Sequence, residues 1–192
     1  MRRVLSLVLV SVFLLCLCGC GSSNSKKKDD EVNTSKVEES KETIKVLNEE
    51  LSNVSYDQYV NVKVGDKLKN VEKELGEANK VKSVGEVKTY SWEGEDGKGL
   101  SLEVKDGVVI SKAQFNLSEG NNEVTIDMYN QLKEGMTQEE VEGILGKGQL
   151  TMEENADGYL RTMYSYYNEN GSSLILNYRD GVLYSMSKNR LD

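Results

Sequence analysis

The chain of 192 residues contains one short pattern twice, and this internal repeat constrains the fold more than any other feature. Residues 56–76 (YDQYVNVKVGDKLKNVEKELG) align without a gap to residues 126–146 (IDMYNQLKEGMTQEEVEGILG). The alignment pairs identical residues at several positions: Asp57 with Asp127, Tyr59 with Tyr129, Gly65 with Gly135, Val71 with Val141, and Gly76 with Gly146. Self-similarity of this kind indicates a protein built from two copies of one structural unit.

Each copy predicts two short helices joined at a glycine. In the later copy Thr125 can cap the first helix, and Gly135 can end it in the left-handed conformation. Thr137 and Glu140 have the spacing of a capping box, which predicts a sharp start for the second helix. The earlier copy has Asp66 where a hydrophobic staple residue would stand, so its second helix should start less sharply.

A second zone of self-match follows each helix pair, now at an offset of 74 residues, with Tyr-Ser-Trp at 90–92 matching Tyr-Ser-Tyr at 164–166. These zones alternate apolar and polar residues and are divided by Asp-Gly or Asn-Gly pairs, which indicates antiparallel hairpins. We expect strands at 79–85, 87–94, 98–105 and 107–116, and again at 149–154, 159–168, 172–179 and 182–189. The sequence therefore predicts an α+β fold of two helix–helix–β-meander repeats, residues 55–120 and 121–192.

The N-terminus has the features of an export signal. Arg2 and Arg3 precede an apolar run, residues 4–17, that is too short to span a bilayer but has the length of a signal-peptide core. The run ends in Leu-Cys-Gly-Cys, which resembles the lipobox of bacterial lipoproteins. The resemblance implies removal of residues 1–19 and attachment of lipid to Cys20, which would hold the protein at the extracytoplasmic face of the cell membrane. An ordinary secreted signal peptide is the alternative. The lysine-rich, proline-free composition favours a Gram-positive source.

Two segments separate this anchor from the repeats. Residues 20–35 have almost no apolar side chains, and we interpret them as a disordered tether. Residues 36–54 are predicted to form an amphipathic helix, because apolar residues recur there at helical spacing: Val37, Ile44, Leu47, Leu51 and Val54.

The tandem units, and above all Gly-Met-Thr-Gln-Glu-Glu-Val-Glu-Gly-Ile-Leu-Gly at 135–146, resemble the family of β-lactamase-inhibitor-protein-like domains. They are also similar to the small outer-membrane assembly lipoproteins of the BamE/OmlA type, which carry one such unit. The resemblance implies one long, curved antiparallel sheet with helices on one face and an open concave face for binding. Inhibitors of this family carry a disulfide in each repeat, whereas the three cysteines here all lie within residues 16–20.

Composition argues against several kinds of chemistry. The chain has no histidine and no cysteine after Cys20, which removes the commonest general base and the commonest transition-metal ligands. No nucleophile elbow and no phosphate-binding loop is present, so we expect neither an enzyme nor a metal or cofactor. The net charge of −8, which becomes −10 when residues 1–19 with their two arginines are removed, disfavours nucleic acid as a partner.

A comparison of outward-facing positions in the two units predicts a binding face. Thr89, Glu93 and Ser101 of the earlier unit correspond to Met163, Tyr167 and Ile175 of the later one, so the later unit has gained apolar side chains. Six residues make up this predicted face: Arg161, Met163, Ser165, Tyr167, Ile175 and Arg179. Exposed Met, Tyr and Arg are typical of protein interfaces. The alternative is that these residues are buried under residues 37–52 or between the units.

Three functions remain open from the sequence. The first is a membrane-anchored, non-enzymatic module that binds an envelope or secreted protein or peptide. The second is an envelope scaffold or assembly lipoprotein that acts through constitutive complexes, and the third is an enzyme of unrecognised type. β-Lactamase inhibition, which the resemblance also implies, ranks below the first two.

Overall fold

The computed structural model describes residues 42–47, 50–118 and 121–192 of the chain. By its internal contacts the chain divides into the units Met1–Glu38 and Glu39–Asp192, and every described residue belongs to the second unit. The predicted signal peptide (1–19), the lipid-bearing Cys20 and the tether (20–35) lie outside the described residues.

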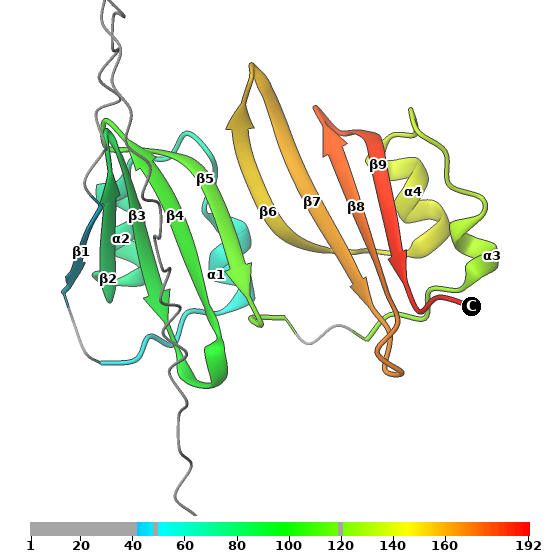
Figure 1. Cartoon of the computed structure of the whole chain (residues 1–192), viewed down its shortest axis with the longest axis horizontal. Helices are drawn as coiled ribbons and strands as arrows, with labels where there is room; N and C mark the ends of the chain where they lie inside the picture. Colours follow the sequence, from blue (N-terminus) through cyan, green and yellow to red (C-terminus); the bar gives the residue numbers. More distant parts are fainter. Residues whose placement is uncertain (1–41, 48–49, 119–120) are drawn as a thin grey trace, which may run out of the picture. The chain divides into compact units, whose positions relative to one another are not determined.

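Short helices alternate with runs of strands along the second unit (Figure 1). The helices are α1 (Tyr56–Asn61), α2 (Leu68–Leu75), α3 (Ile126–Tyr129) and α4 (Gln138–Leu145), with a 3-10 turn, η1, at Glu95–Gly97. The strands are β1 (Thr43–Val46), β2 (Lys80–Val84), β3 (Val87–Glu93), β4 (Gly99–Lys105), β5 (Val108–Phe115), β6 (Gln149–Ala156), β7 (Tyr159–Tyr167), β8 (Ser173–Arg179) and β9 (Val182–Asn189). The order after β1 is thus two helices and four strands, followed by two helices and four strands.

Within the described residues the nine strands form one sheet, ordered β1 to β9 as they occur in the chain. Every neighbouring pair is antiparallel. The predicted α+β class is therefore confirmed. The hairpins form where Asp-Gly pairs predict them: Asp106 and Gly107 both have positive φ (53° and 75°), the conformation of a tight β-hairpin turn.

The helix ends follow the capping residues. Thr137 accepts a hydrogen bond from the backbone N–H of Glu140, whose side chain accepts one from the backbone N–H of Thr137, so the predicted capping box forms. Thr125 caps α3 by accepting from the N–H of Met128. At the start of α2, Lys67 makes no side-chain cap, which agrees with the weaker start predicted there.

The helices cover one face of the sheet, and two apolar clusters lie between the layers. Trp92 is central to the first cluster, and its indole N–H donates to the carbonyl of Gly76 at the end of α2. Tyr166 takes the same place in the second cluster, where its hydroxyl donates to the carbonyl of Gly146 at the end of α4. In each cluster one aromatic side chain therefore fills the core and also satisfies the end of the second helix.

Backbone hydrogen bonds recur in the same way in both halves. The N–H of Gly65 donates to the carbonyl of Val109, and the N–H of Gly135 donates to that of Leu183, both at 2.8 Å. These bonds attach each glycine between the helices to the last strand of its own meander.

The predicted helix over residues 36–54 is wrong in its described part. Residues 43–46 form β1, an edge strand that pairs with β2 from Thr43 opposite Ser83 to Val46 opposite Lys80. All four side chains of β1 are exposed, so the strand is held mainly by its backbone and by an ion pair of 2.8 Å between Glu42 and Lys82. Apolar spacing suggested a helix, but the unpaired edge of β2 offers backbone partners that a helix could not use.

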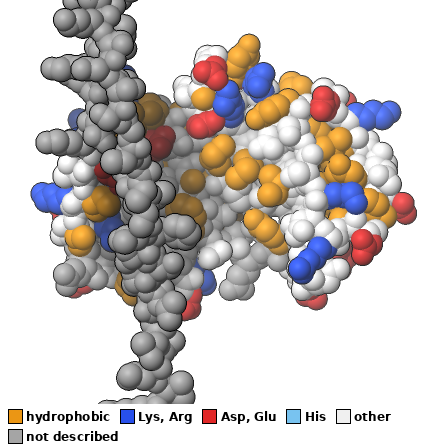
Figure 2. Space-filling model, viewed as in Figure 1, with side chains coloured by type: hydrophobic (Ala, Val, Ile, Leu, Met, Phe, Trp, Pro, Cys, Tyr) orange, Lys and Arg blue, Asp and Glu red, His pale blue; other side chains and the backbone are white. Residues whose placement is uncertain are grey.

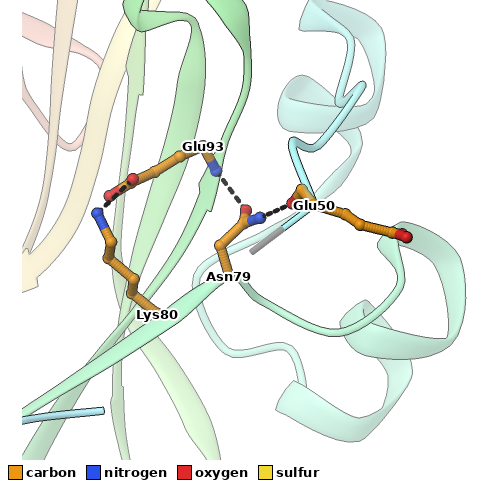
Figure 3. A network of polar contacts seen from close by, with 4 residues as sticks. All are labelled: Glu50, Asn79, Lys80 and Glu93. Carbon is orange, nitrogen blue, oxygen red and sulfur yellow. Dashed lines mark hydrogen bonds and ion pairs between the residues drawn. The ribbon is translucent and has the colours of Figure 1, made fainter. Parts of the chain in front are cut away.

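Asn79 fixes the segment that follows β1 (Figure 3). Its side-chain NH₂ donates to the carbonyl of Glu50, and its side-chain oxygen accepts from the N–H of Glu93 at 2.6 Å. Its backbone carbonyl accepts from the N–H of Leu47. Glu93 also forms an ion pair of 2.6 Å with Lys80. One buried amide therefore ties the leading segment to β3.

A candidate protein-binding groove

The face of the sheet opposite the helices carries a groove of about 680 Å³ that crosses from β5 to β8. Four strands and the neighbouring loops line it: Gly97, Ala113, Gln114, Phe115, Asn116, Ser118, Gln149, Thr151, Met152, Met163, Ser165, Tyr167 and Ile175. Figure 2 shows hydrophobic side chains gathered in the middle of this face, over β6, β7 and β8. We call this hollow the groove.

Four residues of the predicted face lie together in the groove: Met163, Ser165, Tyr167 and Ile175. Strand register explains their proximity, since Ser165 is directly opposite Ile175 and Met163 is directly opposite Met152. Tyr167 is 43% exposed, so it is not covered by the described part of the chain. Residues 43–46 pair with β2, and no described residue of the leading segment lines the groove.

Ser165 corrects one expectation. It lines the groove but is only 1% exposed, so it offers little surface to a partner. The cause is an irregularity of β6 between Leu150 and Met152, which places the Thr151 hydroxyl 3.4 Å from the Ser165 hydroxyl. The Thr151 hydroxyl donates to the carbonyl of Met163. These two hydroxyls therefore close the floor of the groove.

The groove combines apolar walls with one unsatisfied acceptor. Phe115, 52% exposed, forms one wall, and Met152 and Met163 lie side by side on the floor. Gln149, 8% exposed, also lines the groove, and its side-chain oxygen is buried without a hydrogen-bond partner in the described structure. A buried acceptor left unpaired costs about 1 to 3 kcal/mol.

Phe115, Met152 and Gln149 belong to the groove but not to the predicted face. Phe115 was detectable in the sequence, because strand alternation puts Ser111, Ala113 and Phe115 on one face. Its counterpart in the later unit is Asn189, so the earlier unit also gained an apolar side chain on this face. Gln149 and Met152 gave no comparable signal, since their position depends on how β6 pairs with β5 and β7.

Arg161 and Arg179 do not line the groove. They are directly opposite each other on β7 and β8. Arg161 forms ion pairs with Glu154 at 3.4 Å and with Asp157 at 2.5 Å. The Arg179 guanidinium instead lies against two tyrosine rings. The structure therefore separates the predicted face into an apolar groove and an arginine pair at the end of the strands.

A buried lysine lies on the helix side of the strand that borders the groove. Lys112 is 0% exposed, and its ammonium donates to the carbonyl of Val62 at 2.6 Å and to that of Tyr59 at 3.3 Å. These carbonyls are at the end of α1, where a positive charge is favourable. Burial lowers the pKa of Lys112 to about 8, with a further lowering from Lys63, while Glu153 and Asp66 act in the opposite direction.

This lysine predicts that the domain becomes more stable as the pH rises from 7.5 to 9.5. A folded-state pKa of about 8 lies below the ordinary value of 10.5, so between these values the unfolded chain binds more protons than the folded one. The contribution of Lys112 to the free energy of unfolding should therefore increase with pH, by about 2 kcal/mol over this range. Burial raises the pKa of Tyr59, Tyr166 and Tyr178, which offsets part of this increase near pH 9.5. Urea unfolding followed by Trp92 fluorescence measures it. Lys112→Met should remove the increase, and an equal increase in both proteins would contradict the assignment.

Two further features concern what the described residues lack. No helix among them is both long and apolar enough to cross a bilayer. No group of three or more Asp and Glu side chains in the described ranges is arranged to hold a metal ion.

Comparison with known proteins identifies the family. Residues 55–168, more than half of the chain, match the family model described as beta-lactamase inhibitor (BLIP). The chain belongs to the BLIP family. A solved structure from Streptococcus mutans, described as a "putative beta-lactamase inhibitor protein", shares the fold with a TM-score of 0.57 and 16% identity. That comparison covers 73% of this chain and 92% of the other. No curated protein matches the chain.

BLIP-family membership bears on function at a coarse level. The family is named for inhibitors, which act by binding another protein and not by catalysis. This agrees with the predicted non-enzymatic, protein-binding module.

Proposed function

We propose that this BLIP-family protein binds a segment of another extracytoplasmic protein in the groove. The observation that carries the proposal is the groove itself, which places Phe115, Met163, Tyr167 and Ile175 around one hollow on the helix-free face. Apolar and aromatic side chains gathered on a surface and rimmed by polar groups are characteristic of protein-interaction sites.

The proposal includes a repeat architecture. We treat residues 55–120 and 121–192 as two copies of one helix–helix–meander unit. The recurring bonds at Gly65 and Gly135, and the matching roles of Trp92 and Tyr166, support this interpretation. The groove would then belong to neither unit alone, because β5 comes from the first and β6 to β8 come from the second.

In-cell cross-linking from position 167 tests the groove. In one variant a photoreactive residue replaces Tyr167. In a control variant the same photoreactive residue replaces Glu139, an exposed position on α4 at the helix side. One dominant protein partner captured from position 167 and not from position 139 would support the proposal. The family model makes a β-lactamase the first partner to look for. A cross-link from position 167 to residues 36–41 of the same chain would contradict the proposal, because the groove would then be filled internally.

We further propose that Cys20 carries lipid and holds the domain at the outer face of the cell membrane. The support is the sequence Leu-Cys-Gly-Cys after a short apolar run. Cys20→Ser should abolish labelling by an alkyne fatty-acid analogue and move the protein out of the membrane fraction, since one apolar run of this length cannot span a bilayer. Unchanged labelling and fractionation of Cys20→Ser would contradict the anchor.

A further inference from the structure

Arg179 is held between two aromatic rings at one end of the later strands. Its guanidinium carbon lies 5.1 Å from the ring centre of Tyr159 and 4.6 Å from that of Tyr184. Both rings are partly exposed, Tyr159 at 43% and Tyr184 at 37%. Stacking against rings restricts a guanidinium group without using its N–H donors. Contact with two rings therefore restricts the Arg179 guanidinium and leaves its N–H donors available.

Arg179 makes no direct ion pair among the described residues, and no acceptor in that part of the chain takes a hydrogen bond from it. The nearby acids are already engaged: Glu154 and Asp157 pair with Arg161, and the side chain of Asp180 accepts from the N–H of Leu160. Like charges directly opposite on neighbouring strands are unfavourable, and Arg179 is directly opposite Arg161.

We propose that Arg179 is a carboxylate receptor, which binds an Asp or Glu side chain of the segment that occupies the groove. This inference rests on the proposed function and specifies the chemistry of its partner. Ile175 in the groove and Arg179 are on the same face of β8, four residues apart, which corresponds to about 13 Å. An extended partner segment covers that distance in about four residues. The partner motif is therefore an apolar residue and an acidic residue separated by about four positions.

A single carboxylate suits this site better than a phosphate chain. The planar guanidinium can bind a carboxylate through two parallel hydrogen bonds. Glu154, Asp157 and Asp180 surround the site, and the chain carries a net charge of −8. Repulsion from these charges grows with the number of charges on the ligand, so a polyanion such as nucleic acid is disfavoured more strongly than one carboxylate. Figure 2 shows basic, acidic and hydrophobic side chains close together at the upper end of the face, beyond the hydrophobic middle.

Selection from a display library of random peptides, with the full-length protein in detergent as bait, provides the test. One selected peptide is then synthesised together with a version in which its acidic residue is replaced by the corresponding amide. Both are titrated by fluorescence anisotropy against the wild-type protein, Arg179→Gln and Lys133→Gln. Lys133 is exposed on the helix side, so its variant controls for the loss of one positive charge.

The inference expects selected peptides to share an acidic residue about four positions from an apolar one. Arg179→Gln should weaken the affinity for the acidic peptide roughly tenfold to a hundredfold. It should leave the affinity for the amide version unchanged within about twofold. Lys133→Gln should leave both affinities unchanged. Peptides without acidic preference, or equal losses for both peptides, would overturn the carboxylate receptor while leaving the groove intact. Failure to select any peptide would contradict the proposal that the groove binds a protein segment, and the inference about Arg179 with it.

Discussion

Replacing Trp92 with alanine is expected to lower the free energy of unfolding by about 3 to 5 kcal/mol. Trp92 is 1% exposed and fills the first apolar cluster between the sheet and helices α1 and α2. The substitution leaves a cavity and also frees the carbonyl of Gly76, to which the indole N–H donates. Because domains of this size are stable by only about 5 to 15 kcal/mol, the loss is a large fraction of the total.

Urea unfolding followed by far-ultraviolet circular dichroism measures this change, since Trp92 is the only tryptophan. Tyr166→Phe is the matched control in the second cluster. It removes only the hydroxyl that donates to the carbonyl of Gly146, so it should cost about 1 kcal/mol. A loss below about 1 kcal/mol for Trp92→Ala would show that the first cluster is not packed as described.

Replacing Met163 with aspartate is expected to reduce capture of the partner from position 167 by at least about tenfold. Met163 is on the groove floor opposite Met152, so the substitution places a charge where an apolar partner side chain would lie. Loss of one central interface anchor typically costs about 2 kcal/mol or more. Met163 is only partly buried, so the fold should tolerate the change, and the thermal midpoint verifies this.

Thr89→Asp is the control for this variant. Thr89 occupies the equivalent position in the earlier unit and is paired with Glu103, outside the groove. It should leave capture unchanged. Equal loss in both variants would indicate a general charge effect, and no loss in either would place the partner elsewhere on the molecule.

The sequence predicts most of the fold, because its signals are local. Asp106-Gly107 and Asp180-Gly181 adopt the turn conformation that such pairs favour, so the flanking strands lie within a few residues of their predicted bounds. Thr137 and Glu140 likewise determine the start of α4 by bonds within four residues. The helix prediction for the leading segment is wrong because the structure of residues 43–46 depends on pairing with β2, which is distant in the sequence. The alternation of Ile44 and Val46 with polar residues is too short to outweigh the longer helical spacing.

The lining of the candidate groove was only partly predictable for the same reason. Met163, Tyr167 and Ile175 emerge from comparison of equivalent strand positions, and the register of β7 and β8 brings them together. The burial of Ser165 results from an irregularity in β6 that no local pattern signals. Lys112 resembles a solvent-exposed lysine in an alternating strand, and only the position of α1 over the sheet reveals that it is buried.

The joint between β5 and β6 gives the groove a second property. These strands pair from Ser111 opposite Glu154 to Ala113 opposite Met152, whereas β7 and β8 pair over a longer stretch, from Arg161 opposite Arg179 to Tyr167 opposite Ser173. The groove spans this short joint, with Phe115 on one side and Met163 on the other. A bound segment that contacts both sides would stabilise the pairing of β5 with β6. By linkage, stable pairing of β5 with β6 would in turn strengthen binding of the segment. Substitutions that loosen the joint would weaken binding without altering any side chain that the partner touches.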